Sequence, residues 1–247
     1  SEDPSATFTY SLVTGDEWFV INGNQIRTKD PLNFETKSVY TIVVKSTRQH
    51  GLSLDKELSI SLANVNEQPT LDAIANSSVC ATTAEQAIAL SGISAGEDVN
   101  QNTTVSVIAT NNAMFKSIQV SQAVNGNAML KYRLIEGSVG SSVINITVTD
   151  NGGTENGGVN TIMKSFVVNV NALPVISITS DKGLSVSKGD IAVLKAEVSG
   201  GNAGLSYSWS DANGIRSLAK NQSTLEVRPT ETTTYTLTVT NENGCVS

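Results

Sequence analysis

Apolar and polar residues alternate in many short runs along this chain, which is the pattern of half-buried β-strands. In the run at 7–13, Phe8, Tyr10 and Leu12 share one face, and the strongest alternation lies at 143–149. No window shows a helical period, so the predicted fold class is all-β. Further strands are predicted at 18–21, 25–28, 39–44, 58–62, 87–93, 103–110, 129–134, 165–170, 175–178, 192–198, 205–209, 224–227 and 234–240.

Two prolines divide these runs into three groups. Pro69 has no amide donor and pushes Gln68 towards an extended conformation, which suits a chain leaving one sheet for another. Pro174 marks a second joint of the same kind. The chain is therefore predicted to form three β-sandwich domains, the first incomplete at its N-terminal side and the third at its C-terminal side, with boundaries at 1–68, 69–172 and 173–247.

Composition and charge narrow the classes of partner. The chain has 247 residues, 39% of them hydrophobic and 5% aromatic, so several small aliphatic cores are expected. Its net charge of -7 and pI near 4.8 would repel phosphate backbones, which argues against nucleic acid. No apolar run approaches the ~20 residues that a membrane span needs.

Cysteine and histidine are scarce. Cys80 and Cys245 fall in different predicted domains, so we expect two unpaired thiols, with a bridge between domains as the alternative. The single histidine, His50, lies in a predicted exposed loop, and neither a nucleophile elbow nor a zinc-binding cluster is present in the sequence. Small sandwiches rarely offer the deep cleft that paired catalytic carboxylates need, so the chain is predicted not to be an enzyme.

The linker at 64–69 offers side-chain oxygens where two domains would meet. Its sequence is Asn-Val-Asn-Glu-Gln-Pro, and oxygen-rich joints can bind a hard cation such as Ca²⁺. The alternative is a hydrogen-bonded polar linker without metal. Two other clusters of oxygen-bearing side chains, Glu97 and Asp98 beside Asn100, and Asp150 with Glu155, are expected to be solvated turns, with weak Ca²⁺ binding as their alternative.

The first quarter of the chain resembles a bacterial cadherin repeat in the order and spacing of five blocks, at 8–12, 19–21, 32–35, 40–44 and 64–69. In that family a Leu-Asp-x-Glu block and an Asp-x-Asn-Asp-x-Pro linker ligate Ca²⁺ between successive repeats. The resemblance implies a Ca²⁺ site at the first joint. Its ligands would be Glu35, Asn66 and Glu67, with Asn33 and Asn64 at positions where the family has Asp.

These departures bear on the strength of the implied site. Asn33 and Asn64 each remove a negative charge, which should weaken Ca²⁺ binding. Arg48 stands near the position of another family Asp, where it would repel a nearby cation.

The remaining segments carry further resemblances. Residues 69–172 resemble the Ig-like or cadherin-like repeats of large bacterial surface proteins, on the blocks at 90–93, 96–97 and 146–153 and a final Phe-x-Val-x-Val strand. Residues 173–247 resemble a PKD-type or Ig-like domain, on Tyr207-x-Trp209 and the run at 234–239. Trp209 is expected to be core, with a sugar-stacking surface residue as the alternative.

Together these resemblances imply tandem Greek-key β-sandwich (cadherin/Ig-like) domains arranged end to end. The expected function is a non-catalytic structural or adhesive segment of an extracellular or cell-surface protein. Its partners would be other protein modules or surface glycans, and the oligomeric state is left open. The alternative is an accessory carbohydrate-binding or spacer region of a secreted polysaccharide-degrading enzyme.

Overall fold

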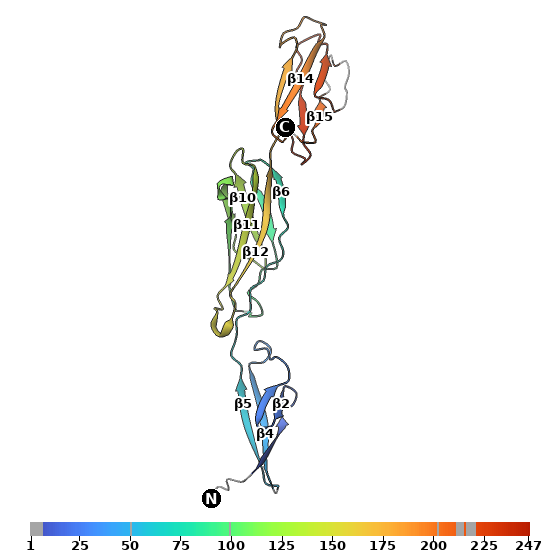
Figure 1. The fold of residues 1–247 in the computed structure, drawn as a ribbon. Helices are drawn as coiled ribbons and strands as arrows, with labels where there is room; N and C mark the ends of the chain where they lie inside the picture. Colours follow the sequence, from blue (N-terminus) through green and yellow to red (C-terminus); the bar gives the residue numbers. More distant parts are fainter. Residues whose placement is uncertain (1–6, 50, 99, 202, 211–214, 216–220) are drawn as a thin grey trace. The chain divides into compact units, whose positions relative to one another are not determined.

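The all-β prediction is confirmed by a computed structural model of the chain (Figure 1). It describes residues 7–49, 51–98, 100–201, 203–210, 215 and 221–247, so His50 lies outside the described residues. Within these ranges the elements are β-strands and two three-residue 3₁₀ helices. Neither described helix is long and apolar enough to cross a membrane.

The first group of strands forms a three-stranded sheet and a hairpin around a small core. The sheet has the order β1-β4-β5, and the hairpin pairs β2 with β3. Their bounds are β1 (Phe8–Thr14), β2 (Phe19–Asn22), β3 (Gln25–Thr28), β4 (Val39–Arg48) and β5 (Ser53–Ser61). Phe19, Tyr40 and Ile42 form the buried core. The face predicted to be half-buried on β1 stays 49% exposed at Phe8 and 41% at Tyr10, because the core contacts gather at its Leu12 end.

The second group forms a sandwich of two sheets, with orders β7-β10-β9 and β6-β12-β11-β8 (Figure 1). This is an immunoglobulin-like arrangement in which the first strand pairs, parallel, with the last. The strands are β6 (Ser77–Cys80), β7 (Gln86–Leu90), β8 (Thr103–Ala109), β9 (Phe115–Val120), β10 (Ala128–Leu134), β11 (Gly140–Asp150) and β12 (Thr161–Asn171). The 3₁₀ helices are η1 (Asn112–Met114) and η2 (Glu155–Gly157).

Strict alternation along β11 fills the centre of this sandwich. Ile144, Ile146 and Val148 are fully buried, while the residues between them are more exposed. The same alternation brings Asp150 onto the buried face, where it is only 5% exposed. A carboxylate in that position needs polar partners, because burying a charge without them is costly.

The third group pairs a three-stranded sheet, β13-β14-β16, with the two strands β15 and β17. Their bounds are β13 (Val175–Ser180), β14 (Ala192–Ser199), β15 (Ser206–Trp209), β16 (Thr224–Val227) and β17 (Leu237–Thr240). Trp209 is 8% exposed, packs in the core and donates its indole N–H to the Gln222 carbonyl at 3.0 Å. The core role predicted for Trp209 is therefore confirmed.

Replacing Trp209 by Phe should lower the free energy of unfolding by at least about 1 kcal/mol, because the Gln222 carbonyl loses its donor. Thermal unfolding measures the loss. Tyr207→Phe, two residues earlier on the half-buried face of the same strand, is the matched control and should change the melting temperature little. Altered glycan binding by Trp209→Phe at an unchanged melting temperature would contradict the core role.

Two compact units arise when residues are grouped by proximity. The first holds the described residues up to Thr70 together with the loops Ser94–Thr104 and Thr149–Ile162. The second holds Leu71–Ile93, Val105–Val148 and Met163–Ser247. Each sheet nevertheless takes all its strands from one of the three predicted ranges, whose boundaries stay a prediction.

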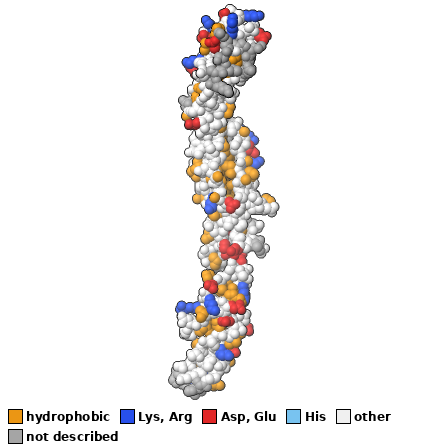
Figure 2. All heavy atoms as spheres, turned by 90° about the vertical axis from the view of Figure 1, so that its right-hand side faces the viewer, with side chains coloured by type: hydrophobic (Ala, Val, Ile, Leu, Met, Phe, Trp, Pro, Cys, Tyr) orange, Lys and Arg blue, Asp and Glu red, His pale blue; other side chains and the backbone are white. Residues whose placement is uncertain are grey.

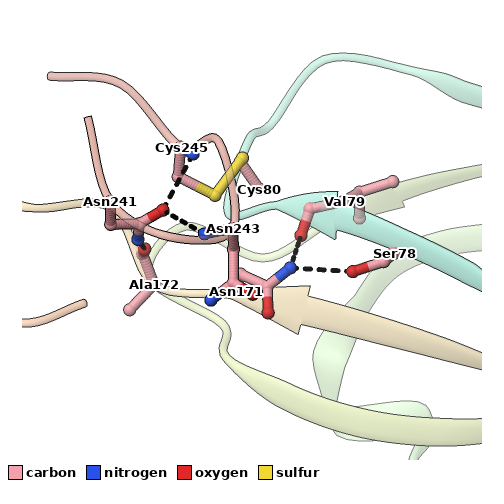
Figure 3. The surroundings of a disulfide bond; sticks show 8 residues. All are labelled: Ser78, Val79, Cys80, Asn171, Ala172, Asn241, Asn243 and Cys245. Atoms are coloured by element: carbon pink, nitrogen blue, oxygen red, sulfur yellow. Dashed lines mark hydrogen bonds between the residues drawn. A yellow bond between two sulfur atoms is a disulfide. The ribbon is translucent and has the colours of Figure 1, made fainter. Parts of the chain in front are cut away.

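The expectation of two unpaired thiols is wrong. Cys80 and Cys245 form a disulfide with a Cα–Cα distance of 5.5 Å (Figure 3). Cys80 ends β6, where the Ala81 N–H donates to the Asn171 carbonyl at 2.8 Å, and Cys245 follows the turn after β17. Two cysteines distant in sequence therefore meet because each lies at the end of its own sandwich.

Candidate metal centre

Three carboxylates converge within the first compact unit. Ligand oxygens of Glu35, Glu67 and Asp98 all lie within 4.8 Å of one another. Glu35 stands in the turn between β3 and β4, Glu67 in the linker after β5, and Asp98 in the loop Ser94–Thr104. All three residues are half-buried, so the chain places three negative charges together out of full contact with water.

The spacing of these oxygens fits a calcium ion. Ca²⁺ binds oxygen ligands at about 2.3–2.6 Å, so two of its ligands can stand at most about 5 Å apart. Carboxylate oxygens within 4.8 Å of one another can therefore share one ion without rearrangement of the backbone. Carboxylates are also the ligand type that this hard cation prefers.

Four buried oxygen atoms at this place have no hydrogen-bond partner in the described part of the chain. Two belong to the carboxylate cluster, namely Glu35 Oε1 and Glu67 Oε2. The others are Gln101 Oε1 and Asp150 Oδ2, from the two loops of the same unit. Buried polar atoms in native proteins are nearly always paired, so the unpaired oxygens of Glu35 and Glu67 within the carboxylate cluster fit a bound cation.

A cavity opens beside two of the three carboxylates. Its volume is about 250 Å³, and Glu35 and Glu67 line it together with Leu32, Asn33, Phe34, Leu62, Ala63 and Val65. A water molecule takes up about 30 Å³ in the liquid, so there is room for a cation with several waters. Waters could therefore complete the coordination that three carboxylates leave unfilled.

The surroundings of Glu67 disfavour the charged form of its carboxylate. Burial raises the pKa of Glu67 above its ordinary value of 4.5, and the nearby charges of Glu35, Asp98 and Glu97 raise it further. The charged form of Glu67 is thus disfavoured in the folded chain. A positive charge at this place would relieve that cost.

Asn33 and Asn64, two of the predicted ligands, lie beside the cluster and donate to carboxylates. The Asn33 amide donates to Glu97 at 2.7 Å, while its Oδ1 accepts the Thr36 N–H at 2.9 Å. The Asn64 amide donates to both oxygens of Asp98, at 3.2 and 3.3 Å. Both side chains therefore hold the loop Ser94–Thr104 by hydrogen bonds, and their role as ligands stays a prediction.

Asn66, the third predicted amide ligand, is buried and organises both loops. Its Nδ2 lies within hydrogen-bond distance of Asp150 Oδ1 and of the Gly153 and Val159 carbonyls, at 3.0, 3.2 and 3.0 Å. Its Oδ1 accepts from Gln101 Nε2 at 2.7 Å. The side chain thus works as a polar link between the linker and the loops, and its ligand role also stays a prediction.

The glycine-rich loop is shaped to admit Asn66. A Cβ on Gly152 would collide with the Asn66 side-chain oxygen, and one on Gly158 would stand 3.0–3.2 Å from Asn66 atoms. Only a residue without a side chain leaves room for the amide at Gly152. This loop was expected to hold solvated turn residues, but Asp150 within it is buried and bonded to Asn66.

Arg48 lies too far from the three carboxylates to repel a cation bound there. It ends β4, whose first residue, Val39, pairs with Ser61 next to the linker. A ten-residue strand is about 30 Å long, so the guanidinium stands far from the carboxylates. The expectation that Arg48 repels the cation is therefore wrong.

In comparisons with known proteins, similarity was found only to solved structures. No protein-family model and no curated protein matches the sequence. Solved structures of tandem extracellular cadherin domains are similar. Protocadherin gamma B2 domains 3–6 (17% identity, TM-score 0.47) and Drosophila N-cadherin domains 1–4 (12%, 0.45) are matched over 97% and 100% of this chain. Mouse protocadherin-24 domains 1–3 (15%, 0.41) are matched over 96%.

The chain spans 66% of the gamma B2 and N-cadherin structures and 86% of the protocadherin-24 structure. Identities and scores this low say nothing about which ligand this chain binds.

The part of the site that comes from the two loops could not be recognised from the sequence. Glu35 and Glu67 were predicted ligands and do converge, but Asp98 was assigned to a solvated turn. The side chains of Gln101 and Asp150 were not connected with the linker. A signal for Asp150 was present, because it continues the alternating buried series of β11.

Proposed function

We propose that this chain is a non-catalytic structural segment of an extracellular protein, in which Glu35, Glu67 and Asp98 bind Ca²⁺. The observation that carries the proposal is the convergence of three half-buried carboxylates with two unpaired buried oxygens in the same cluster. The cation, when bound, supplies the positive charge that offsets their repulsion.

The three ligands would connect three segments of the chain through one cation. Glu35 belongs to a turn between strands of the first sheet group, and Glu67 to the linker that follows it. Asp98 belongs to a loop that is covalently continuous with β7 and β8. Binding one cation with all three residues would therefore restrain the linker at both ends and limit bending at the first joint.

Two further observations bear on the compartment and on the partners. A disulfide between distant cysteines persists in oxidising compartments and is rare in the cytosol. On the face drawn in Figure 2, basic side chains of the described residues lie among acidic ones and form no extended basic surface for nucleic acid. The partners we propose are other protein modules or surface glycans. The assignment to a bacterial surface protein rests on the residue blocks quoted above.

The carbohydrate-binding alternative needs exposed aromatic rings. Trp209 and Tyr132 are 8% and 1% exposed, so neither can stack on a sugar. Trp18 packs edge-on against Tyr40, and the Lys37 ammonium covers its ring at 3.9 Å. The rings of Trp18, Tyr132 and Trp209 are thus occupied by the protein itself, whereas Phe8 and Tyr10 on β1 stay exposed.

Calcium should raise the thermal stability of the chain and chelator should lower it. Ca²⁺ at about 100 times its dissociation constant should stabilise the folded state by about 2.7 kcal/mol. Isothermal titration should show one cation per chain, and Asp98→Asn should weaken binding at least tenfold. Glu57→Gln, an exposed residue of β5 in the same unit, removes the same charge away from the cluster and should bind as the wild type does.

Mg²⁺ is a useful competitor in this experiment, because it demands shorter bonds and a stricter octahedron. It should stabilise the chain less than Ca²⁺. Melting curves that coincide in Ca²⁺ and in chelator, together with a flat titration, would refute the proposed site.

A further inference from the structure

The disulfide between Cys80 and Cys245 closes a covalent ring around most of the chain. The two cysteines are 165 positions apart, and the strands from β7 to β17 all lie within the ring. Only the first sheet group, the linker and β6 precede the ring, and Val246 and Ser247 follow it. The second and third sandwiches are therefore closed at one point, where their two cysteines meet.

Hydrogen bonds fix the backbone on both sides of this point (Figure 3). On one side, Asn171 at the end of β12 donates its amide to Ser78 Oγ at 2.9 Å and to the Val79 carbonyl at 3.3 Å. On the other, Asn241 Oδ1 accepts the Cys245 N–H at 2.9 Å, and Asn241 Nδ2 donates to the Ala172 carbonyl at 3.1 Å. Adjacent residues of one segment, Asn171 and Ala172, thus bond to both cysteine-bearing segments.

Residues on either side of the bridge are also paired into sheets. β6 pairs in parallel with β12 from Ser77 to Cys80, so the chain entering the bridge is hydrogen-bonded along its length. The chain leaving the bridge folds back on β17, where the Val239 and Ser247 N–H groups bond to each other's carbonyls at 2.8 and 3.0 Å. Cys245 itself is fully buried.

We propose that the bridge is a mechanical bypass, which carries tension from Cys80 directly to Cys245 and prevents residues 81–244 of the second and third sandwiches from extending. Tension applied to the two ends of the chain must pass through the shortest covalent path between them. With the bridge closed, that path crosses the sulfur atoms and omits the 164 residues between them. Those residues can lose their structure under load, but they cannot lengthen the chain.

The bypass divides the chain into an extensible and an inextensible part. The residues before Cys80 stay in the path of tension, and they include Glu35, Glu67 and the linker. A biological role for this bypass rests on the proposed function of the chain as a structural segment. The lengths that the bridge permits depend only on covalent connectivity.

Pulling on single molecules by the two ends of the whole chain tests the proposal. The oxidised protein should extend by at most about 290 Å, the length of its first 80 residues at about 3.6 Å each. With the bridge reduced by dithiothreitol, which is itself oxidised to a cyclic disulfide as two cysteine thiols form, about 590 Å more should be released. Cys80→Ser and Cys245→Ser should each release this additional length without reductant.

A length above about 290 Å from oxidised protein with no titratable thiols would overturn the proposal, and so would equal lengths before and after reduction. If a cysteine variant fails to fold, reduction of the wild-type protein under load still gives the comparison. Repeating the pulls in Ca²⁺ and in chelator separates the two proposals. A change in the unfolding force of the first part reports the cation, whereas the additional length reports the bridge.

Discussion

Replacing Asn66 by alanine should lower the free energy of unfolding of the first compact unit by about 3 kcal/mol or more. The change removes the donor that Asp150 Oδ1 and the Gly153 and Val159 carbonyls share. A buried group left without its partner costs about 1–3 kcal/mol, and more when it is charged. Asp150 is the costly member, because its Oδ1 would keep only the Gly152 N–H at 2.9 Å and its Oδ2 already has no partner among the described residues.

Denaturant unfolding in chelator measures this loss without any contribution from a cation. Asn64→Ala is the matched control, since Asn64 is the same residue type in the same linker but exposed, and the loss of its exposed hydrogen bonds to Asp98 should cost only about 1 kcal/mol. Hydrogen exchange should show the loop Thr149–Ile162 opening in the Asn66 variant and not in the control. Equal losses in the two variants would refute the central role of Asn66.

Glu67→Gln should change stability in opposite directions with and without calcium. In chelator near neutral pH, the variant should be more stable than the wild type, because it removes a charge that burial and the neighbours Glu35 and Asp98 disfavour. In saturating Ca²⁺ it should be less stable, because one of three carboxylate ligands is lost. Thermal unfolding of both proteins, in chelator and in saturating Ca²⁺, checks whether the stability difference changes sign.

The pH dependence in chelator gives a second reading of the same residue. The pKa of Glu67 is raised in the folded chain, so the folded state takes up its proton more readily than the unfolded state does. The stability that this group contributes is full below its ordinary value of 4.5 and is lost as the pH rises through the higher folded value. Glu67→Gln should remove this part of the pH profile, whereas Glu57→Gln should keep it.

Most strands that could be predicted have one face more buried than the other, although β3 was also predicted and is exposed throughout. β16 matches its prediction at Thr224–Val227, and β11 is only extended at both ends. β6 was missed because Ser-Ser-Val-Cys is short and mostly polar, and its pairing with β12 comes from the tertiary fold. β9 was missed although Phe115 and Ile118 face inward more than their neighbours, because its pattern is irregular.

Ligands of the site could be predicted only where they belong to a recognisable block of sequence. Glu35 and Glu67 belong to recognisable blocks, whereas Asp98 comes from a loop that local sequence marks only as a polar turn. For the same reason the disulfide could be predicted only as the alternative to two unpaired thiols, since nothing near Cys80 or Cys245 indicates that the two meet. Both features depend on contacts between distant segments, which periodicity does not record.

The composition of the first compact unit bears on how the chain can be divided for experiments. A recombinant fragment ending at Gln68, the boundary that sequence alone suggests, would lack Asp98, Gln101 and Asp150. Its Asn66 would then be exposed to solvent with none of its loop partners, and its affinity for calcium would understate that of the intact polypeptide. Fragments meant to report on this unit should therefore extend at least through Asn171, the end of β12.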